Sequence, residues 1–195
     1  GPDWLILRTR SMLWALPVRP GRSGHAAACG TIGISCGIVD CSMAKNNYGI
    51  NGSPNSHIAH PAGLPCFGSL PEFVSRGDVV PAGDIFLRVG NHRGPNSGFG
   101  VRHIWAEHEK ELVRLGYHTV NDVARFVCDV IQPGAGVYCE FNHPGGKHRP
   151  KVLRSALGIV ILEPKEADWA QSGWIYSVVT AYETHRTQGT LLGRL

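Results

Sequence analysis

The chain has 195 residues and a mass of 21.1 kDa, enough for one domain of medium size with an appended segment. Apolar residues make up 43% and charged residues 17%, so the composition excludes a wholly disordered chain and predicts a buried core. No run of 18 uninterrupted apolar residues occurs, and the sequence therefore predicts no membrane-spanning segment. A net charge of +4 is compatible with an anionic partner, but by itself it indicates only a mildly basic globular protein.

Residues 1–83 differ in composition from the remainder. They contain 12 glycines and 8 prolines and show no sustained helical or strand periodicity. We therefore predict a loop-rich N-terminal segment over residues 1–83, serving delivery, linkage or docking, and a folded domain over residues 84–195.

The folded domain is predicted to begin with a short strand and two helices. Alternating apolar residues favour a strand at 84–89, and an apolar stripe favours a helix at 101–115 that ends at Gly116. Thr119 and Asp122 form a weak variant of the capping box, and a second helix runs from there to Pro133.

Strand propensity then returns in three segments: 136–141, 151–162 and 173–182. Polar connections separate them, which is typical of an antiparallel meander. The predicted fold class is α+β: a short strand, two helices, then an antiparallel strand meander, with a Gly/Pro-rich N-terminal segment.

The six cysteines, at positions 29, 36, 41, 66, 128 and 139, match no zinc-binding spacing. Disulfides in a secreted segment and buried small apolar side chains are both compatible with them, and the second is favoured for Cys128 and Cys139. The sequence predicts no metal site and no cofactor.

Ten histidines are present, and His103 falls in the first turn of the first predicted helix. Free backbone N–H groups and the helix dipole at that place favour an anion and help the imidazole to act as a base. The simpler alternative is a histidine that caps or decorates an exposed helix start.

His108 lies five residues further, about 140° around the helix axis from His103, so the sequence predicts that the two rings do not share a pocket. We therefore assign His108 to the apolar stripe. The segment is not a zincin motif, which needs two histidines four residues apart.

Two further segments are candidates for nucleic-acid contact. The turn 142–151 gathers three cations and two imidazoles, as either a solvated hairpin tip or a phosphate clamp. A two-residue period in the last predicted strand places Trp174, Tyr176, Val178, Thr180 and Tyr182 on one face. That face is compatible with a half-buried sheet and with a platform for a base and a phosphate.

The segment Gly98-Phe99-Gly100, the following His103-Ile104 and the closing Thr180-Ala181-Tyr182, in this order of elements, resemble a known group of enzymes. The group is the toxin- and phage-associated branch of the barnase, EndoU, colicin and RelE-like (BECR) ribonuclease superfamily. The resemblance extends over residues 84–185. It implies an endoribonuclease that needs no metal: the RNA 2′-OH attacks the adjacent phosphorus and leaves a 2′,3′-cyclic phosphate.

The resemblance also implies site residues. It assigns the catalytic groups to His103, Thr180, Tyr182 and Arg88. It assigns substrate binding to His148, Arg149, Lys151 and Arg154. The general acid stays open, with His148 and Arg149 as alternatives.

The acidic residues agree with a metal-independent mechanism. Asp84, Asp122, Asp129 and Asp168 are far apart in the sequence, and two-metal nucleases need clustered oxygen ligands. Cleavage in excess EDTA is the expected behaviour.

Members of this superfamily often form the C-terminal toxin module of secreted bacterial effectors. The resemblance implies a toxin of bacterial competition that is secreted or delivered from its producer and acts in the target-cell cytoplasm. Its partners would be RNA, whether tRNA, rRNA or mRNA, and a cognate immunity protein over a basic cleft. The alternatives are an ADP-ribosyltransferase toxin, for which no Glu-x-Glu stands near a late strand, and a non-catalytic phage or secretion-system structural module.

Overall fold

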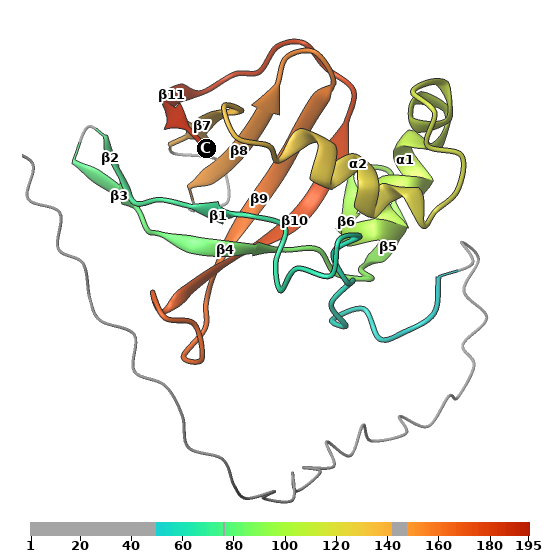
Figure 1. Ribbon diagram of the computed structural model, residues 1–195, viewed down its shortest axis with the longest axis horizontal. Coiled ribbons are helices and arrows are strands. Elements are labelled where there is room, and N and C mark those ends of the chain that lie inside the picture. The colour runs from blue at the N-terminus through green and yellow to red at the C-terminus, as the bar shows by residue number, and fades with distance from the viewer. Residues whose placement is uncertain (1–49, 76, 142–147) are drawn as a thin grey trace, which may run out of the picture. The chain divides into compact units, whose positions relative to one another are not determined.

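The computed structural model describes residues 50–75, 77–141 and 148–195 (Figure 1). The chain divides after Cys41 into two units, and all the elements below belong to the second, Ser42–Leu195. Its predicted α+β class is confirmed: two helices are followed by a strand meander in a curled, mostly antiparallel sheet. Within the described residues, neither helix has the length and apolar character needed to cross a membrane.

Seven strands form the main sheet, in the order β1-β4-β10-β9-β8-β7-β11. The strands are β1 (Ser69–Leu70), β4 (Gly83–Phe86), β7 (Gly136–Glu140), β8 (Arg149–Arg154), β9 (Gly158–Glu166), β10 (Trp174–Tyr182) and β11 (Thr190–Arg194). Only the β4–β10 pair is parallel; the other neighbours are antiparallel. β10 returns to the first strand of the predicted domain, and β11 extends the opposite edge of the sheet.

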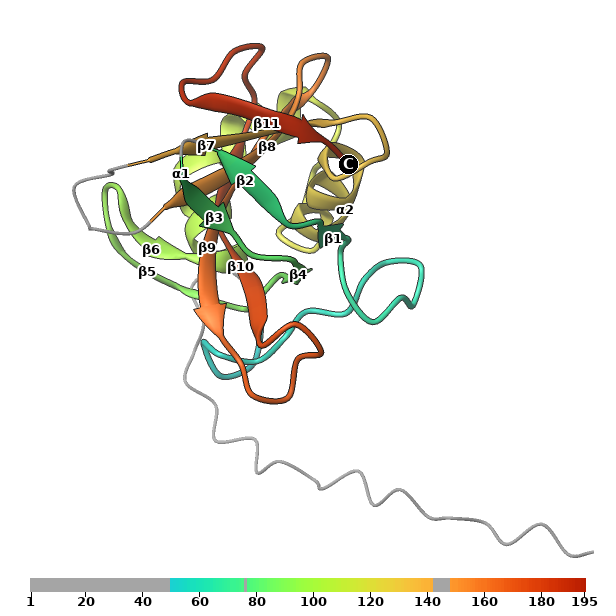
Figure 2. The same cartoon turned by 90° about the vertical axis from the view of Figure 1, so that its left-hand side faces the viewer.

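Two short hairpins stand apart from the main sheet (Figure 2). They are β2 (Phe73–Ser75) with β3 (Asp78–Val80), and β5 (Asn91–Gly94) with β6 (Ser97–Phe99). The second hairpin leads directly into the first helix. It turns through Asn96, which has a left-handed backbone (φ 56°).

Both predicted helices are present, as α1 (Gly100–Arg114) and α2 (Asp122–Val130). Half of the predicted capping box forms: the Asp122 carboxylate accepts hydrogen bonds from the backbone N–H and the hydroxyl of Thr119, both at 2.9 Å. The α1 stripe of Val101, Ile104 and Leu112 is buried, as its spacing predicts.

The predicted strand 151–162 is wrong as a single element. It divides into β8 and β9, which form a hairpin closed by a hydrogen bond of 2.8 Å from Leu157 N–H to the Arg154 carbonyl. The central residues of both strands are buried, and the prediction passed over the polar residues Arg154 and Ser155 that form the turn between them.

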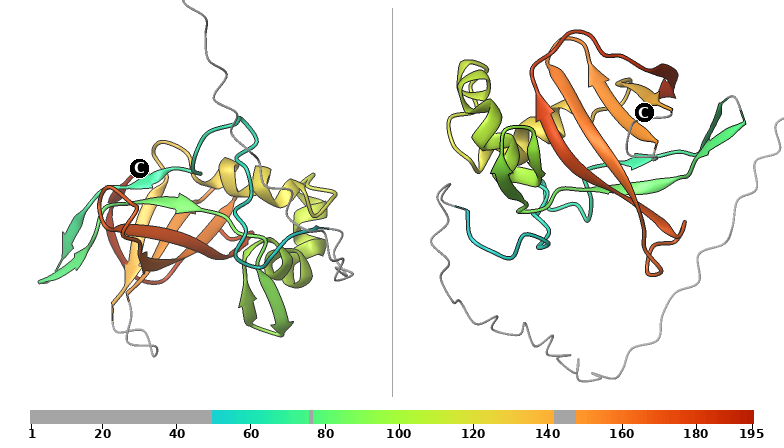
Figure 3. Two further views of the ribbon diagram at one scale, coloured as in Figure 1. Left: turned by 90° about the horizontal axis from the view of Figure 1, so that it is seen from below. Right: turned by 180° about the vertical axis from the view of Figure 1, so that it is seen from behind.

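The helices cover one face of the sheet, and the main hydrophobic core lies between them. α1 packs on β10, and α2 packs on β8 and β9. The opposite face of β8–β10 has no helix over it in the view from behind (Figure 3). A smaller apolar cluster of Leu153, Ile159 and Ile161 lies apart from the main core.

The predicted boundary at residue 83 falls inside β4. β1 pairs with β4, and Phe67, Leu70 and Val80 are buried in the same core as the helices. Residues 50–83 therefore contribute to this fold. Residues 1–49, with Cys29, Cys36 and Cys41, lie outside the described residues, and so do residues 142–147 of the predicted phosphate clamp.

Candidate active site

A cleft lies between α1 and the strands β7, β8 and β10. β10 pairs with β4 only as far as Ser177 opposite Phe86, and α1 packs against β10. The cleft has a volume of about 920 Å³. Its lining includes groups from α1, β7, β8, β10 and the segment before β11: His103, Glu107, His108, Glu140, Arg149, Lys151, Thr180, Tyr182, Arg186, Thr187 and Gln188.

A β-bulge in β10 decides which of its residues reach the cleft. The pairing with β9 shifts between Val178 and Thr180. Tyr176 and Val178 are buried in the core before the bulge, whereas Thr180 and Tyr182 line the cleft after it. The predicted common face for these residues is therefore wrong, because the extra residue of a bulge exchanges the two faces of a strand.

His103 is the most buried polar group of the cleft, with only 5% of its surface exposed. Burial lowers the pKa of its imidazole below the ordinary value; Glu107 raises this pKa, while His92 and His108 lower it further. Gly98 makes room for the ring, since a Cβ there would lie 2.9 Å from His103 Nδ1 and would also collide with the Asn91 carbonyl. The left-handed φ of Gly98 also favours glycine.

The anion site predicted at the start of α1 is partly occupied by the chain itself. The N–H groups of Val101 and Arg102 donate to the carbonyls of Arg88 and Val89, each at 3.0 Å. These two first-turn donors bind carbonyls of the segment that follows β4, so they are not free for an anion.

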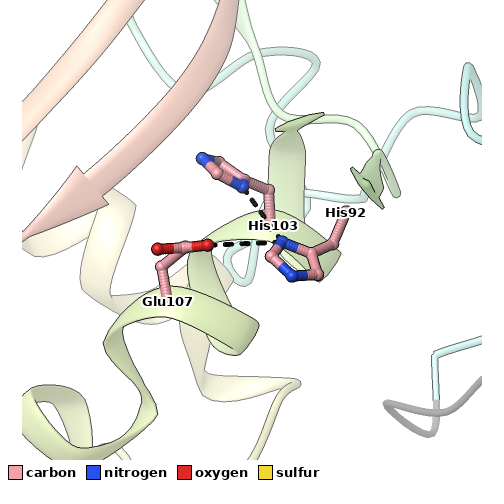
Figure 4. A group of neighbouring side chains, drawn as sticks. All are labelled: His92, His103 and Glu107. Atoms are coloured by element: carbon pink, nitrogen blue, oxygen red, sulfur yellow. Dashed lines mark hydrogen bonds and ion pairs between the residues drawn. The ribbon is translucent and has the colours of Figure 1, made fainter. Parts of the chain in front are cut away.

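His92 and Glu107 stand next to His103 (Figure 4). The Nδ1 atoms of His92 and His103 are 3.4 Å apart, and His92 Nδ1 lies 3.6 Å from Glu107 Oε1. His103 Nε2 points away from both neighbours. Sequence analysis missed this group because His92 comes from the unrecognised β5–β6 hairpin.

His108 lines the same cleft as His103, which corrects the prediction from the 140° separation. Its ring stacks on Tyr182 with centroids 5.1 Å apart, and its Nδ1 lies 3.4 Å from Glu111 Oε2. The 140° angle describes the directions in which the two side chains leave the helix. Both side chains still line one cleft, because the cleft extends along the helix and accepts side chains over a wide arc.

Lys151 and Arg149 place positive charge in the cleft. Lys151 is buried: its Nζ lies 2.6 Å from Glu140 Oε1 and donates to the Gln188 carbonyl at 3.3 Å. Glu140 lies opposite Arg149 in the register of β7 and β8. With Arg186, the lining has three cations against the carboxylates of Glu107 and Glu140.

The structure places three predicted site residues elsewhere. His148 lines a separate cavity of about 670 Å³, and Arg154 donates to the Asp129 carbonyl at the end of α2. Side chains alternate between the two faces of a strand, so His148 and Arg154 lie on the face opposite to Arg149 and Lys151. Arg88, which follows β4, donates to Ser177 Oγ of β10 at 2.9 Å and lies over the Phe99 ring of β6. Its contacts therefore hold these elements together.

Sequence analysis also missed Arg186, Thr187 and Gln188, which reach the cleft from the connection between β10 and β11. No periodicity marks a connection of this kind. Cys128 and Cys139 are free and buried, as expected of small apolar side chains, and burial raises the pKa of both thiols to about 11.

Comparison with protein-family models, with curated proteins and with solved structures finds no match to this chain.

Proposed function

We propose that this chain is a metal-independent endoribonuclease, the toxin module of a secreted bacterial effector. The observation that supports it is the pair of imidazoles in one cationic cleft. Nδ1 of His103 contacts Nδ1 of His92, whereas Nδ1 of His108 lies 3.4 Å from Glu111 Oε2 without a hydrogen bond. We infer that Nε2 of each ring serves the substrate.

Cleavage by this pair proceeds through attack of the ribose 2′-OH. His103 takes the proton from the 2′-OH, the oxygen attacks the adjacent phosphorus, and His108 donates a proton to the departing 5′-oxygen. The lowered pKa of His103 suits the base, because the ring is then neutral near pH 7. The products end in a 2′,3′-cyclic phosphate and a 5′-hydroxyl.

The remaining cleft groups suit a phosphodiester. Arg149 and Lys151 stabilise the negative charge that grows on the phosphorane oxygens. Thr180 lines the cleft, and its buried Oγ1 has no hydrogen-bond partner among the described residues; a rotation of the side chain would bring this hydroxyl to a phosphate oxygen. Tyr182 holds the His108 ring by stacking and brings a phenol to the same cleft.

The proposal includes partners. A toxin of this type requires its producer to hold an immunity protein, and a cleft with excess positive charge favours an acidic surface on that protein. Delivery into the cytoplasm of a target cell would bring the cleft to RNA.

The test compares three histidine variants of the purified full chain on RNA. His103→Ala is expected to lower the cleavage rate by about 10²- to 10⁴-fold, the usual contribution of an acid–base group, and His108→Ala by about 10²-fold. His118→Ala is the matched control, because His118 is exposed and does not line the cleft. Wild-type rates in both cleft variants, with all three melting temperatures preserved, would overturn the proposal.

A further inference from the structure

The group formed by His92, His103 and Glu107 has the geometry of a metal-ligand set. His92 comes from β5, and the other two residues stand one turn apart on α1. Their three ligand atoms lie within 4.8 Å of one another, and no other group of three such residues is found among those that the structure describes. Figure 4 shows the three side chains converging from these elements.

The separations fit a tetrahedral ion. Zn²⁺ binds imidazole nitrogen and carboxylate oxygen at about 2.0–2.1 Å, which places ligand atoms about 3.3–3.4 Å apart at the corners of a tetrahedron. The separations of 3.4 Å between the two Nδ1 atoms and 3.6 Å from His92 Nδ1 to Glu107 Oε1 are close to two edges. The third separation, between His103 and Glu107, is within 4.8 Å, so the Glu107 side chain has to move to reach an ion held by both imidazoles.

The donor set selects the class of ion. Two imidazoles and one carboxylate are typical of catalytic zinc sites and of other divalent transition-metal sites, whereas Mg²⁺ and Ca²⁺ take mainly oxygen ligands. The environment is also suitable: His103 is buried, while the His92 and Glu107 side chains are 19% and 22% exposed. An ion can therefore enter from the solvent side and bind in a largely dry place.

We propose that His92 Nδ1, His103 Nδ1 and Glu107 Oε1 form a site for a divalent transition-metal ion of the Zn²⁺ class. A fourth position would be left to water or to an oxygen of a bound anion. Glu107 follows His103 by four residues, so the helix itself presents these two ligands on one face.

One consequence rests on the proposed function. An ion on His103 Nδ1 keeps the remaining ring proton on Nε2, so that Nε2 no longer accepts a proton from the RNA 2′-OH. The bound ion would then inhibit cleavage, and a chelator would restore it. The metal site would be an inhibitory site of the nuclease.

The test of the site uses Co²⁺ alone and needs no RNA. Metal-free full chain is titrated with Co²⁺ and followed by visible absorption, and Zn²⁺ is then added as a competitor. We expect one equivalent of Co²⁺ with an intense tetrahedral spectrum and no thiolate charge-transfer band. Affinity should fall at least 10-fold in His92→Ala and in Glu107→Gln, and stay unchanged in His118→Ala.

Several results would overturn the site: no binding by the wild type, a thiolate band that places the ion on cysteines, or wild-type affinity in both ligand variants. His92 and Glu107 are partly exposed, and thermal melting of each variant establishes that it is folded. The titration therefore reports on ligands and not on loss of structure.

A second arm separates this inference from the proposed function. Zn²⁺ is added to the RNA cleavage reaction at concentrations around the measured dissociation constant, with the wild type and with Glu107→Gln. Inhibition of the wild type at a concentration that spares Glu107→Gln supports the inhibitory role. Binding without inhibition removes that role and leaves the site, while absence of cleavage in a chain that binds Co²⁺ counts against the nuclease alone.

Discussion

The two faces of the curled sheet are made by the same strands but differ in what covers them. On one face, α1 and α2 close an apolar core over residues such as Val152 and Val178. On the other, Lys151 and Thr180 line an open cleft. Successive side chains of a strand point to opposite faces of the sheet, so one packs in the core while its neighbour lines the cleft. Residues that stabilise this fold and residues that we assign to its chemistry are therefore neighbours in the sequence but lie on different faces.

The largest contrast is expected between the neighbours Val152 and Lys151 of β8. Val152→Ala should lower the free energy of unfolding by about 2–3 kcal/mol, because it removes two buried methyl groups and leaves a cavity. Lys151→Met should lower the RNA cleavage rate by about 10²-fold, as for other lost charge-stabilising donors. Urea denaturation and initial rates measure the two effects.

The control for Lys151→Met is the double variant with Glu140→Gln, which removes the carboxylate left without its cation. It should regain any lost stability but no activity. Full activity in the double variant would contradict the assignment of Lys151 to the substrate.

Gly98 and Gly94 allow two alanine variants to be compared within the β5–β6 hairpin, which precedes α1. Both have left-handed φ values, so alanine at either position should cost about 1–3 kcal/mol of strain. Only at Gly98 does the new methyl group meet other atoms, the Asn91 carbonyl and His103 Nδ1, so Gly98→Ala should cost more stability; nothing lies within 4 Å of a Cβ at Gly94.

Gly98→Ala should therefore also lower the cleavage rate, by about 10²-fold for a displacement near 1 Å, and Gly94→Ala should not. The measurement is the rate of each variant per folded molecule. Equal rates in the two variants would show that the position of His103 is not critical.

A smaller effect is expected across the bulge of β10. Thr180→Val replaces a buried hydroxyl without a partner among the described residues, so stability should stay equal or rise by about 1 kcal/mol, while cleavage falls about 10-fold. Val178→Thr is the reverse change on the core face and should cost about 1–3 kcal/mol. Thermal denaturation and kinetics distinguish them; a destabilised Thr180→Val would mean that the hydroxyl serves the fold.

The smallest effect is expected at Asp122, the first residue of α2. Hydrogen bonding from Thr119 lowers the pKa of Asp122 below its ordinary 3.8, so the ionised carboxylate stabilises the fold at neutral pH. Asp122→Asn should lose about 0.5–1 kcal/mol there, because it removes a negative charge from the first turn of α2 and weakens the hydrogen bonds from Thr119. The difference from the wild type should shrink as the pH falls below 3.8, and a difference that persists at pH 2 would exclude this cause.

The helices and most of the meander were predictable because their apolar periods are long. The stripe of α1 marks its buried face directly, and Thr119 with Asp122 marks the start of α2. Sequence analysis missed the β8–β9 turn, although Arg154, Ser155 and Gly158 interrupt the apolar run, because it assigned the strand propensity on both sides of them to one strand.

The site was predictable only in part. His103, Thr180, Tyr182, Arg149 and Lys151 were named from the sequence and share the cleft. The same reasoning included His148 and Arg154, because the alternation of β8 was not applied to them.

The remaining features of the site come from irregularities of the strands, which leave no hydrophobic periodicity in the sequence. His92 arrives through a hairpin of only seven described strand residues, with a register shift between His92 and Gly94. The bulge after Val178 likewise exchanges the faces of β10 without any change in composition. Such irregularities are fixed by tertiary packing, which no local pattern reports.

The central claim is that the cleft cleaves RNA by attack of its 2′-OH without a metal. The direct measurement is cleavage of a short RNA in excess EDTA, beside the same RNA with 2′-deoxyribose at the cleaved position. The account predicts cleavage of the first to a 2′,3′-cyclic phosphate end and complete resistance of the second. Equal cutting of the deoxy substrate, or activity that vanishes with EDTA and returns with Mg²⁺, would contradict it.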